Sequence, residues 1–252
     1  MDALPDYIDR RIRRAIPTDA SVVSGSTPVV SFGNSRTANV ATLGLNPSRV
    51  EFLDRNGNRL TDADRRLATH ESLGTENLSD ASPDIIAQVL QDCDEYFSRN
   101  PYRRWFDQLE IVLKQCGVSY YDGTACHLDL VQWATDPTWG RLESKSVRQE
   151  LLNADASFLS DQLSRENISI LLVNGSGVIR QLKRSLNVNF VEHDPITGYR
   201  NHDTRLFTGT IFGNTSVIAW STNLQSSFGV STELKTELAK QVAALIPRQT
   251  VA

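Results

Sequence analysis

Short strands that are apolar on both faces, separated by helical segments, constrain this chain most strongly. Ile168–Asn174 reads Ile-Ser-Ile-Leu-Leu-Val-Asn and is almost uninterrupted in apolar residues. Asn39–Leu45 and Val217–Trp220 have the same character. Strands of this kind are typical of parallel sheets whose two faces are both covered by helices. The sequence therefore predicts an α/β fold, a three-layer α/β/α sandwich around a mostly parallel central sheet.

Helical periodicity fills the segments between the strands. Ile8, Ile12 and Ile16 recur at four-residue spacing within Tyr7–Ile16, which is the pattern of one helix face. Further helices are predicted over Pro83–Phe97, Tyr102–Cys116, Val147–Ser164, Val178–Leu186 and Thr232–Ile246. Further strands are predicted over Pro28–Phe32, which would pair with Asn39–Leu45 in a hairpin, over Gly123–Trp133, and over Thr208–Phe212, which would pair with Ser216–Trp220 around Gly213-Asn214.

The length and composition suit one large domain over residues 1–252. The chain is 40% hydrophobic and 22% charged, an ordinary globular composition. No internal repeat or low-complexity linker divides it. Residues 1–27 are expected to form an N-terminal basic helix and linker, followed by the core over residues 28–246.

Charge and cysteine content limit the partners and the compartment. The net charge of −4 gives no global argument for nucleic acid, so such contact would depend on local arginine groups. These groups are Arg10-Arg11 with Arg13-Arg14, Arg65-Arg66, and Arg99 with Arg103-Arg104. Three cysteines without a CxxC pair indicate reduced thiols. With neither a signal-peptide profile after Met1 nor an apolar run of the ~20 residues that span a bilayer, we expect a cytoplasmic monomer without membrane contact.

Polar residues follow the predicted strands at the points where the strands end. Asn39–Leu45 leads into Asn46-Pro47-Ser48, and the strand over Gly123–Trp133 ends in the region Asp129–Trp133. Ile168–Asn174 leads into Gly175-Ser176-Gly177. Val217–Trp220 leads into Ser221–Gln225. Ligands of open α/β sheets bind outside the carboxyl ends of the strands, so these polar ends are expected to meet at one edge. The Asn-Pro pair is equally typical of an ordinary turn.

At these positions the chain resembles the uracil-DNA glycosylase superfamily. Gly44-Leu45-Asn46-Pro47 is similar to the first motif of that superfamily, Gly-x-Asn/Asp-Pro after the first parallel strand. Asp129 lies where members carry a base-reading residue, and Asp136-Pro137 resembles the turn that follows it. Val173–Gly177 resembles the third strand with its Gly-rich exit, and residues 221–228 fall on the last motif and its intercalating loop. The resemblance covers roughly residues 28–246.

The resemblance implies a DNA glycosylase that flips a base out of DNA and hydrolyses its N-glycosidic bond without metal or cofactor. The implied catalytic residues are Asn46, which would hold the attacking water, and Asp129. Leu45, Phe52 and Asn174 are expected at the base. Contacts to DNA are expected from Ser48, Arg49, Ser176, Ser221, Thr222, Asn223, Leu224 and Gln225, with Ser226 and Phe228 in the same loop.

Two further residues near Asp129 are candidates for the base pocket. His127 lies two positions before Asp129 and shares its side of the strand, and Trp133 lies beside the Asp136-Pro137 turn. For His127 a hydrogen-bonded core position is the better interpretation. For Trp133 core packing fits equally well.

Departures from the superfamily pattern bear on the substrate. The last motif carries Ser221-Thr222-Asn223 without the usual histidine, and Asp129 stands where asparagine is common. An ionised carboxylate only accepts hydrogen bonds, which favours a base with an exocyclic amine over uracil. We therefore expect a modified base such as a modified cytosine. Relatives of this fold that act on hypermodified phage DNA extend this expectation to antiviral defence.

Two other functions stay open on the sequence. The missing histidine fits a catalytically silent nucleic-acid-binding member of the fold, and the acidic balance fits a small-molecule nucleoside or nucleotide N-glycoside hydrolase. A metal site built from Glu192-His193-Asp194 and His202-Asp203 is a weaker interpretation than a solvated loop, because the histidines lack metal-ligand spacing.

Overall fold

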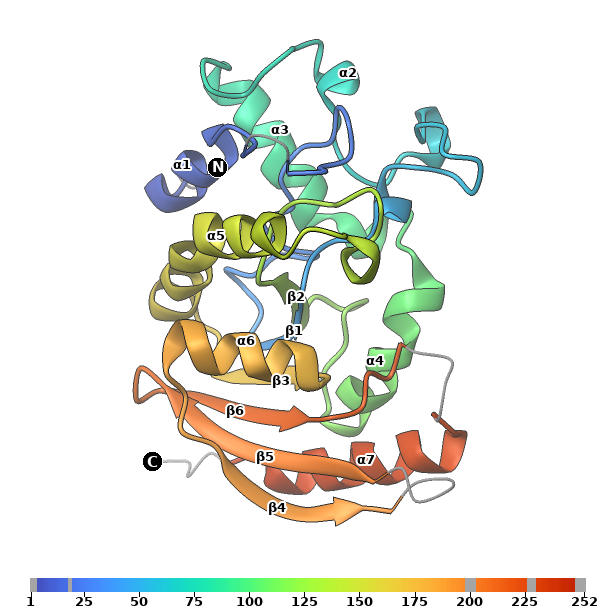
Figure 1. The fold of residues 1–252 in the computed structure, drawn as a ribbon, viewed down its shortest axis with the longest axis vertical. Helices are drawn as coiled ribbons and strands as arrows, with labels where there is room; N and C mark the ends of the chain where they lie inside the picture. The colour runs from blue at the N-terminus through green and yellow to red at the C-terminus, as the bar shows by residue number, and fades with distance from the viewer. Residues whose placement is uncertain (1–3, 18–19, 198–202, 226–229, 248–252) are drawn as a thin grey trace. The chain divides into compact units, whose positions relative to one another are not determined.

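The computed structural model describes residues 4–17, 20–197, 203–225 and 230–247 (Figure 1). Within these ranges the chain is an α/β protein with a six-stranded sheet in the order β2-β1-β3-β6-β5-β4. The described residues form two compact units with interleaved segments. Unit 1 takes residues from 1–34, 45–102 and 128–162, and unit 2 takes residues from 35–44, 103–127 and 163–252. None of the described helices has the length and apolar character to cross a membrane.

The sheet belongs largely to unit 2 and is mixed. Its middle is parallel: β3 (Ile170–Asn174) lies between β1 (Val40–Gly44) and β6 (Thr215–Trp220). Leu171, Leu172 and Val173 of β3 are fully buried, which explains their apolar character on both faces. At one edge of the sheet, β2 (Ala125–Asp129) lies beside β1 and is shorter than the predicted segment.

The other edge of the sheet is antiparallel, so the sheet as a whole is mixed. The predicted hairpin around Gly213-Asn214 is confirmed as β5 (Thr204–Ile211) paired with β6. The segment expected as a loop is an additional edge strand, β4 (Val191–Ile196), antiparallel to β5. Pro195 is tolerated there because an edge strand leaves backbone donors unpaired, and the register shifts between His193 and Ile196.

Three helices of unit 2 cover the two faces of this sheet. α6 (Ser176–Leu186) packs against β3 and β6 through Val178 and Leu182. α7 (Thr232–Leu245) packs against α4 (Arg103–Gln115) and lies on the opposite face from α6 (Figure 1). Helix, sheet and helix therefore form three layers within this unit, as expected from the apolar strands.

Unit 1 is built from helices and irregular buried chain. Its helices are α1 (Asp6–Arg13), α2 (His70–Leu73), α3 (Pro83–Asp94) and α5 (Lys145–Arg165), with short 3₁₀ helices η1 (Arg49–Glu51), η2 (Asp62–Asp64), η3 (Tyr96–Ser98) and η4 (Trp139–Arg141). α3 begins as its sequence indicates, with Ser82 accepting from the Ile85 N–H and proline at the first position.

The predicted strand Pro28–Phe32 is wrong. This segment is buried but irregular, with an isolated bridge at Phe32. Its backbone groups find other partners: the Val29 N–H donates to the Gln132 carbonyl at 2.7 Å, and Gln162 Nε2 donates to the Val30 carbonyl at 2.8 Å. Because side chains and loop backbone satisfy these groups, a buried apolar run here needs no strand partner.

The N-terminal helix is confirmed, but it is not simply a basic surface. Ile8 and Ile12 are buried, whereas Ile16 is 43% exposed because the helix ends at Arg13. Arg11 is 1% exposed and its Nε lies 2.9 Å from Asp155 Oδ1. Arg11 is thus part of the core of unit 1, and its buried guanidinium is not accessible to a binding partner.

Candidate functional site

The loop after β1 holds the side chain of Asn46 in one orientation. Asn46 Nδ2 lies 3.0 Å from the Pro47 carbonyl, 3.1 Å from the Trp133 carbonyl and 3.2 Å from Thr135 Oγ1. Carbonyl oxygens only accept hydrogen bonds, so these contacts define which end of the amide is the donor. The half-buried side chain therefore presents Oδ1 away from them, and no described residue donates to that oxygen.

The backbone on both sides of Asn46 is also fastened within unit 1. The Val131 N–H donates to the Leu45 carbonyl at 3.0 Å. Arg49 Nη1 lies 2.6 Å from Asp136 Oδ1, with both side chains partly exposed. Arg49 was expected at DNA, and here its charge is partly neutralised by Asp136. Ser48 precedes η1 without a side-chain capping bond, so its hydroxyl is not used as a cap.

A buried carboxyl group that the sequence did not single out lies five residues after Asn46. Glu51 is 1% exposed, and the Tyr96 hydroxyl donates to its Oε2 at 2.6 Å. The same hydroxyl accepts from the Tyr102 N–H at 2.9 Å. Burial raises the pKa of Glu51 to about 7, and the charge of Asp129 adds to this, against opposing contributions from Tyr96 and Arg66. Glu51 therefore exchanges a proton near neutral pH.

Sequence reasoning missed Glu51 because Glu51–Thr61 is polar and turn-rich, which is typical of a solvated loop. The only local signal is the apolar pair Phe52-Leu53 that follows it, and both of these residues are buried. The partner that makes the position distinctive, Tyr96, lies 45 residues away.

The aromatic residues expected at the base lie in the core of unit 1. Phe52 and Trp133 are each 2% exposed. Trp133 packs with Val131 and Leu151, and the Arg11 guanidinium lies 5.0 Å from its ring. Neither ring presents a face on which a base could stack, so packing explains both positions. Asp129 is 4% exposed, and its backbone carbonyl accepts a hydrogen bond from Gln132 Nε2 at 2.7 Å.

His127 is a core histidine, which is the interpretation that the sequence favoured. It is 4% exposed, and its Nδ1 is hydrogen-bonded with Thr42 Oγ1 at 2.6 Å. Thr42 is in turn bonded with the Tyr120 hydroxyl at 2.5 Å. Phe106 meets the imidazole edge-on with the ring centroids 5.3 Å apart. This arrangement ties β2 to β1 and leaves the imidazole no open edge.

Asn174, at the end of β3, uses both ends of its amide inside unit 2. Its Nδ2 donates to Asn223 Oδ1 at 3.0 Å and to Gln225 Oε1 at 2.9 Å. Its Oδ1 accepts from Trp220 Nε1 at 2.9 Å and from the Leu224 N–H at 3.0 Å. Asn174 therefore fastens the segment after β6 and is not presented to a base. Leu224, expected to fill the gap left by a flipped nucleotide, is 1% exposed.

The other polar residues expected at DNA in unit 2 join the same network. Ser176 Oγ donates to the Ser221 carbonyl, and Ser221 Oγ accepts from the Arg205 N–H, each at 2.9 Å. The hydroxyls of Thr222 and Thr204 are 2.6 Å apart. Gly175 has φ +99°, a backbone conformation that residues with a side chain rarely adopt, so glycine suits the start of α6. Ser226 and Phe228 lie outside the described residues.

The structure thus brings together two sets of expected residues. Asn46 and Arg49 meet Thr135 and Asp136 in unit 1, and Asn174 meets the segment 221–225 in unit 2. In the described part of the chain, no three His, Cys, Asp or Glu side chains come together as a metal site. His193 instead bonds Thr208 Oγ1 through Nε2 at 2.8 Å, and His202 is not among the described residues.

Comparison with protein-family models finds no model that matches this chain, and comparison with curated proteins finds no matching sequence.

Proposed function

We propose that this protein is a DNA glycosylase of the uracil-DNA glycosylase type that hydrolyses the N-glycosidic bond of a flipped, modified base. The observation that carries the proposal is the oriented amide of Asn46. Three acceptors hold its Nδ2, and its Oδ1 is left as an acceptor on a fastened loop directly after a parallel strand. This is the position at which open α/β sheets bind their ligands.

An oriented amide oxygen suits the positioning of a water. The water would donate a hydrogen bond to Asn46 Oδ1 and direct a lone pair at the sugar C1′ atom. Its oxygen forms the new bond to C1′ while the bond from C1′ to the base nitrogen breaks. The electron pair of the broken bond stays with the base, and a proton of the water passes to the departing base or to solvent.

Two buried carboxyl groups of unit 1, those of Asp129 and Glu51, favour a base with an exocyclic amine. Asp129 is the expected base-reading residue, and a carboxylate in that place accepts hydrogen bonds only. Glu51 is close enough for the charge of Asp129 to raise its pKa, and two such groups resist ionising together. A modified cytosine in DNA, including phage DNA, is therefore the substrate that we propose.

The test is the release of a base from DNA. The protein would be incubated with duplexes and single strands that carry uracil, hypoxanthine or modified cytosines, and with phage DNA, followed by alkali to cleave abasic sites. We expect abasic sites on a modified-cytosine substrate. DNA binding without abasic sites on any substrate would contradict catalysis and leave a silent binding protein, and failure to bind DNA at low salt would favour a small-molecule hydrolase.

A further inference from the structure

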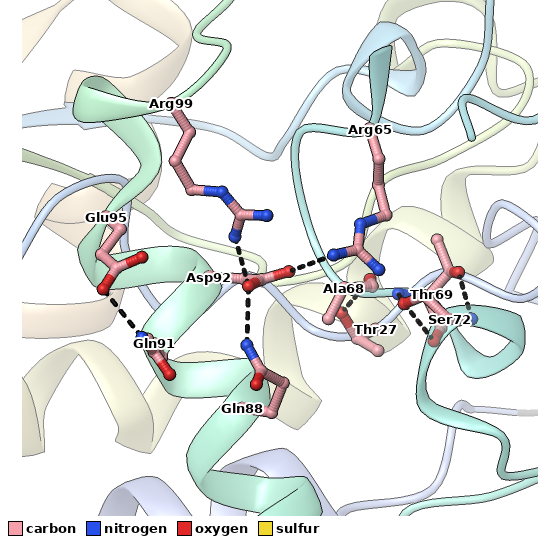
Figure 2. A network of polar contacts seen from close by, with 10 residues as sticks. All are labelled: Thr27, Arg65, Ala68, Thr69, Ser72, Gln88, Gln91, Asp92, Glu95 and Arg99. Atoms are coloured by element: carbon pink, nitrogen blue, oxygen red, sulfur yellow. Dashed lines mark hydrogen bonds and ion pairs between the residues drawn. The ribbon is translucent and has the colours of Figure 1, made fainter. Parts of the chain in front are cut away.

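The structure gathers two arginines on one buried carboxylate in unit 1 (Figure 2). Asp92, on α3, is fully buried. Its Oδ1 accepts from Gln88 Nε2 at 3.0 Å and from Arg99 Nη1, and its Oδ2 faces Arg65 Nη2 at 3.8 Å as an ion pair. Arg65 and Arg99 are 34 positions apart in the sequence, and their common partner is the feature that unites them.

The backbone that follows Arg65 is held in place by hydrogen bonds. Thr27 Oγ1 donates to the Ala68 carbonyl at 2.8 Å, and a capping box between Thr69 and Ser72 closes the start of α2 (Figure 2). These contacts leave little freedom to the loop between η2 and α2. Arg65 therefore approaches Asp92 from a defined position.

The segment that carries Arg99 is joined to the same loop at two further points. Asn100 Nδ2 donates to the Asp64 carbonyl at 3.0 Å. The Arg66 guanidinium lies 5.5 Å from the Tyr102 ring. The two arginine-bearing segments are thus one assembly, and the geometry of the pair does not depend on the ion pairs with Asp92 alone.

Asp92 orients the two arginines without using up their charge or their donors. Each guanidinium carries five N–H donors, and each contacts Asp92 through one terminal nitrogen. The side chains of Arg65 and Arg99 are 26% and 30% exposed, so both are partly open to solvent. Two cations share one anion, which leaves one net positive charge. The neighbouring Glu95 accepts from Gln91 Nε2 at 2.8 Å, and within the described residues the ion pairs of both arginines are with Asp92.

We propose that Arg65 and Arg99 form a clamp for one phosphate of the DNA backbone. Planar guanidinium groups held at a common anchor match the tetrahedral oxygens of a phosphodiester, and arginines positioned in advance lose less entropy on binding. The proposal rests on the proposed function in taking DNA as the partner. It adds a binding site that lies outside the motifs after the strands.

The site is tested by the affinity for DNA and by its dependence on salt. Fluorescence anisotropy with a fluorescein-labelled 20-nucleotide duplex would be measured between 50 and 300 mM KCl. Arg65→Gln leaves Asp92 paired with Arg99 and Gln88, so the variant is expected to fold. We expect its affinity to fall about tenfold and the slope of log K against log salt to shrink by about 0.9, the loss of one phosphate contact.

Two more variants separate the clamp from a general loss of charge. Arg65→Lys keeps the charge but loses the planar fork, so the salt slope should stay while the affinity falls. Arg59→Gln removes an exposed arginine of unit 1 that pairs with Glu71 on the surface, and it should bind like the wild type. Circular dichroism and thermal unfolding of each variant would show that the fold is retained.

The possible results point in different directions for the two proposals. If the wild type binds DNA and Arg65→Gln binds equally well with the same salt slope, the clamp is wrong and the glycosylase proposal stands. If the wild type neither binds DNA nor releases a base, both proposals fail. Inorganic phosphate at constant ionic strength is the third arm of the test. If phosphate displaces DNA from the wild type and not from Arg65→Gln, the clamp is supported. Equal displacement of DNA from both proteins would overturn it.

Discussion

Replacing Glu51 with glutamine should remove a pH dependence from the stability of this protein. Glutamine has the shape of glutamic acid and keeps an oxygen that accepts from the Tyr96 hydroxyl, but it does not titrate. The substitution therefore leaves the packing around position 51 in place while it removes the ionisable group.

The direction and the size follow from the pKa of Glu51 in the folded protein. The pKa rises from 4.5 to about 7, chiefly because the side chain is buried. The folded state thus binds the proton more tightly than the unfolded state. The stabilisation that comes from proton binding at Glu51 is complete below pH 4.5 and is lost as the pH rises through 7. Above that pH the contribution of Glu51 changes little. At 1.36 kcal/mol for each pH unit, the loss is about 3 kcal/mol.

The assay is urea unfolding followed by tryptophan fluorescence at intervals from pH 4.5 to pH 8.5. The difference in free energy of unfolding between wild type and Glu51→Gln should change by about 3 kcal/mol over this range, in favour of the variant at high pH. Glu76→Gln, at an exposed glutamate of the same unit, is the matched control and should run parallel to the wild type. Parallel curves for Glu51→Gln as well would refute the reasoning, since Glu51 would then titrate as it does in the unfolded chain.

Two further substitutions test the buried polar contacts. Arg11→Met should lower the free energy of unfolding by about 3–5 kcal/mol, because it removes the buried cation of Asp155 and leaves only the more distant Arg14 beside it, whereas Arg10→Gln, which breaks an exposed pair with Asp6, should change it by less than about 1 kcal/mol. Equal effects in urea unfolding would contradict the burial of Arg11. Asn174→Ala should lower the free energy of unfolding by about 3 kcal/mol, because Trp220 Nε1–H and the Leu224 N–H lose their acceptor. Ser176→Ala should lower it by about 1 kcal/mol. If Asn174→Ala left the free energy of unfolding unchanged, Asn174 would not be the link between β3 and the segment after β6.

Most helices and the central strands could be predicted from the sequence because their signals are local. Ile170–Asn174 is apolar on both faces because the side chains on both faces of this central strand are buried, and α3 carries its own start signal in Ser82-Pro83. Val191–Ile196 escaped prediction because an edge strand that is largely exposed and contains proline has no such pattern. Pro28–Phe32 was mistaken for a strand because burial alone made it apolar.

The polar residues could be located less well, because their roles depend on partners far along the chain. Arg11 is indistinguishable from Arg10 in the sequence, yet its Nη2 meets Asp155, 144 positions away. The pKa of Glu51 is raised chiefly by burial, which depends on the packing of distant segments, and Asn174 is hydrogen-bonded to four groups that follow β5. The Asn46 loop was the exception, since its glycine, asparagine and proline together define a local turn.

The most direct test of the proposed function compares Asn46→Ala with Asn56→Ala. Asn56 is an exposed residue of the same unit whose side chain does not contact Asn46 or its three acceptors, so it controls for the loss of an asparagine. With a modified-cytosine duplex under single-turnover conditions, we expect Asn46→Ala to form abasic sites about 100-fold more slowly while its DNA affinity is retained, and Asn56→Ala to match the wild type. Equal rates of abasic-site formation in Asn46→Ala and the wild type would contradict the assignment of the water to Asn46.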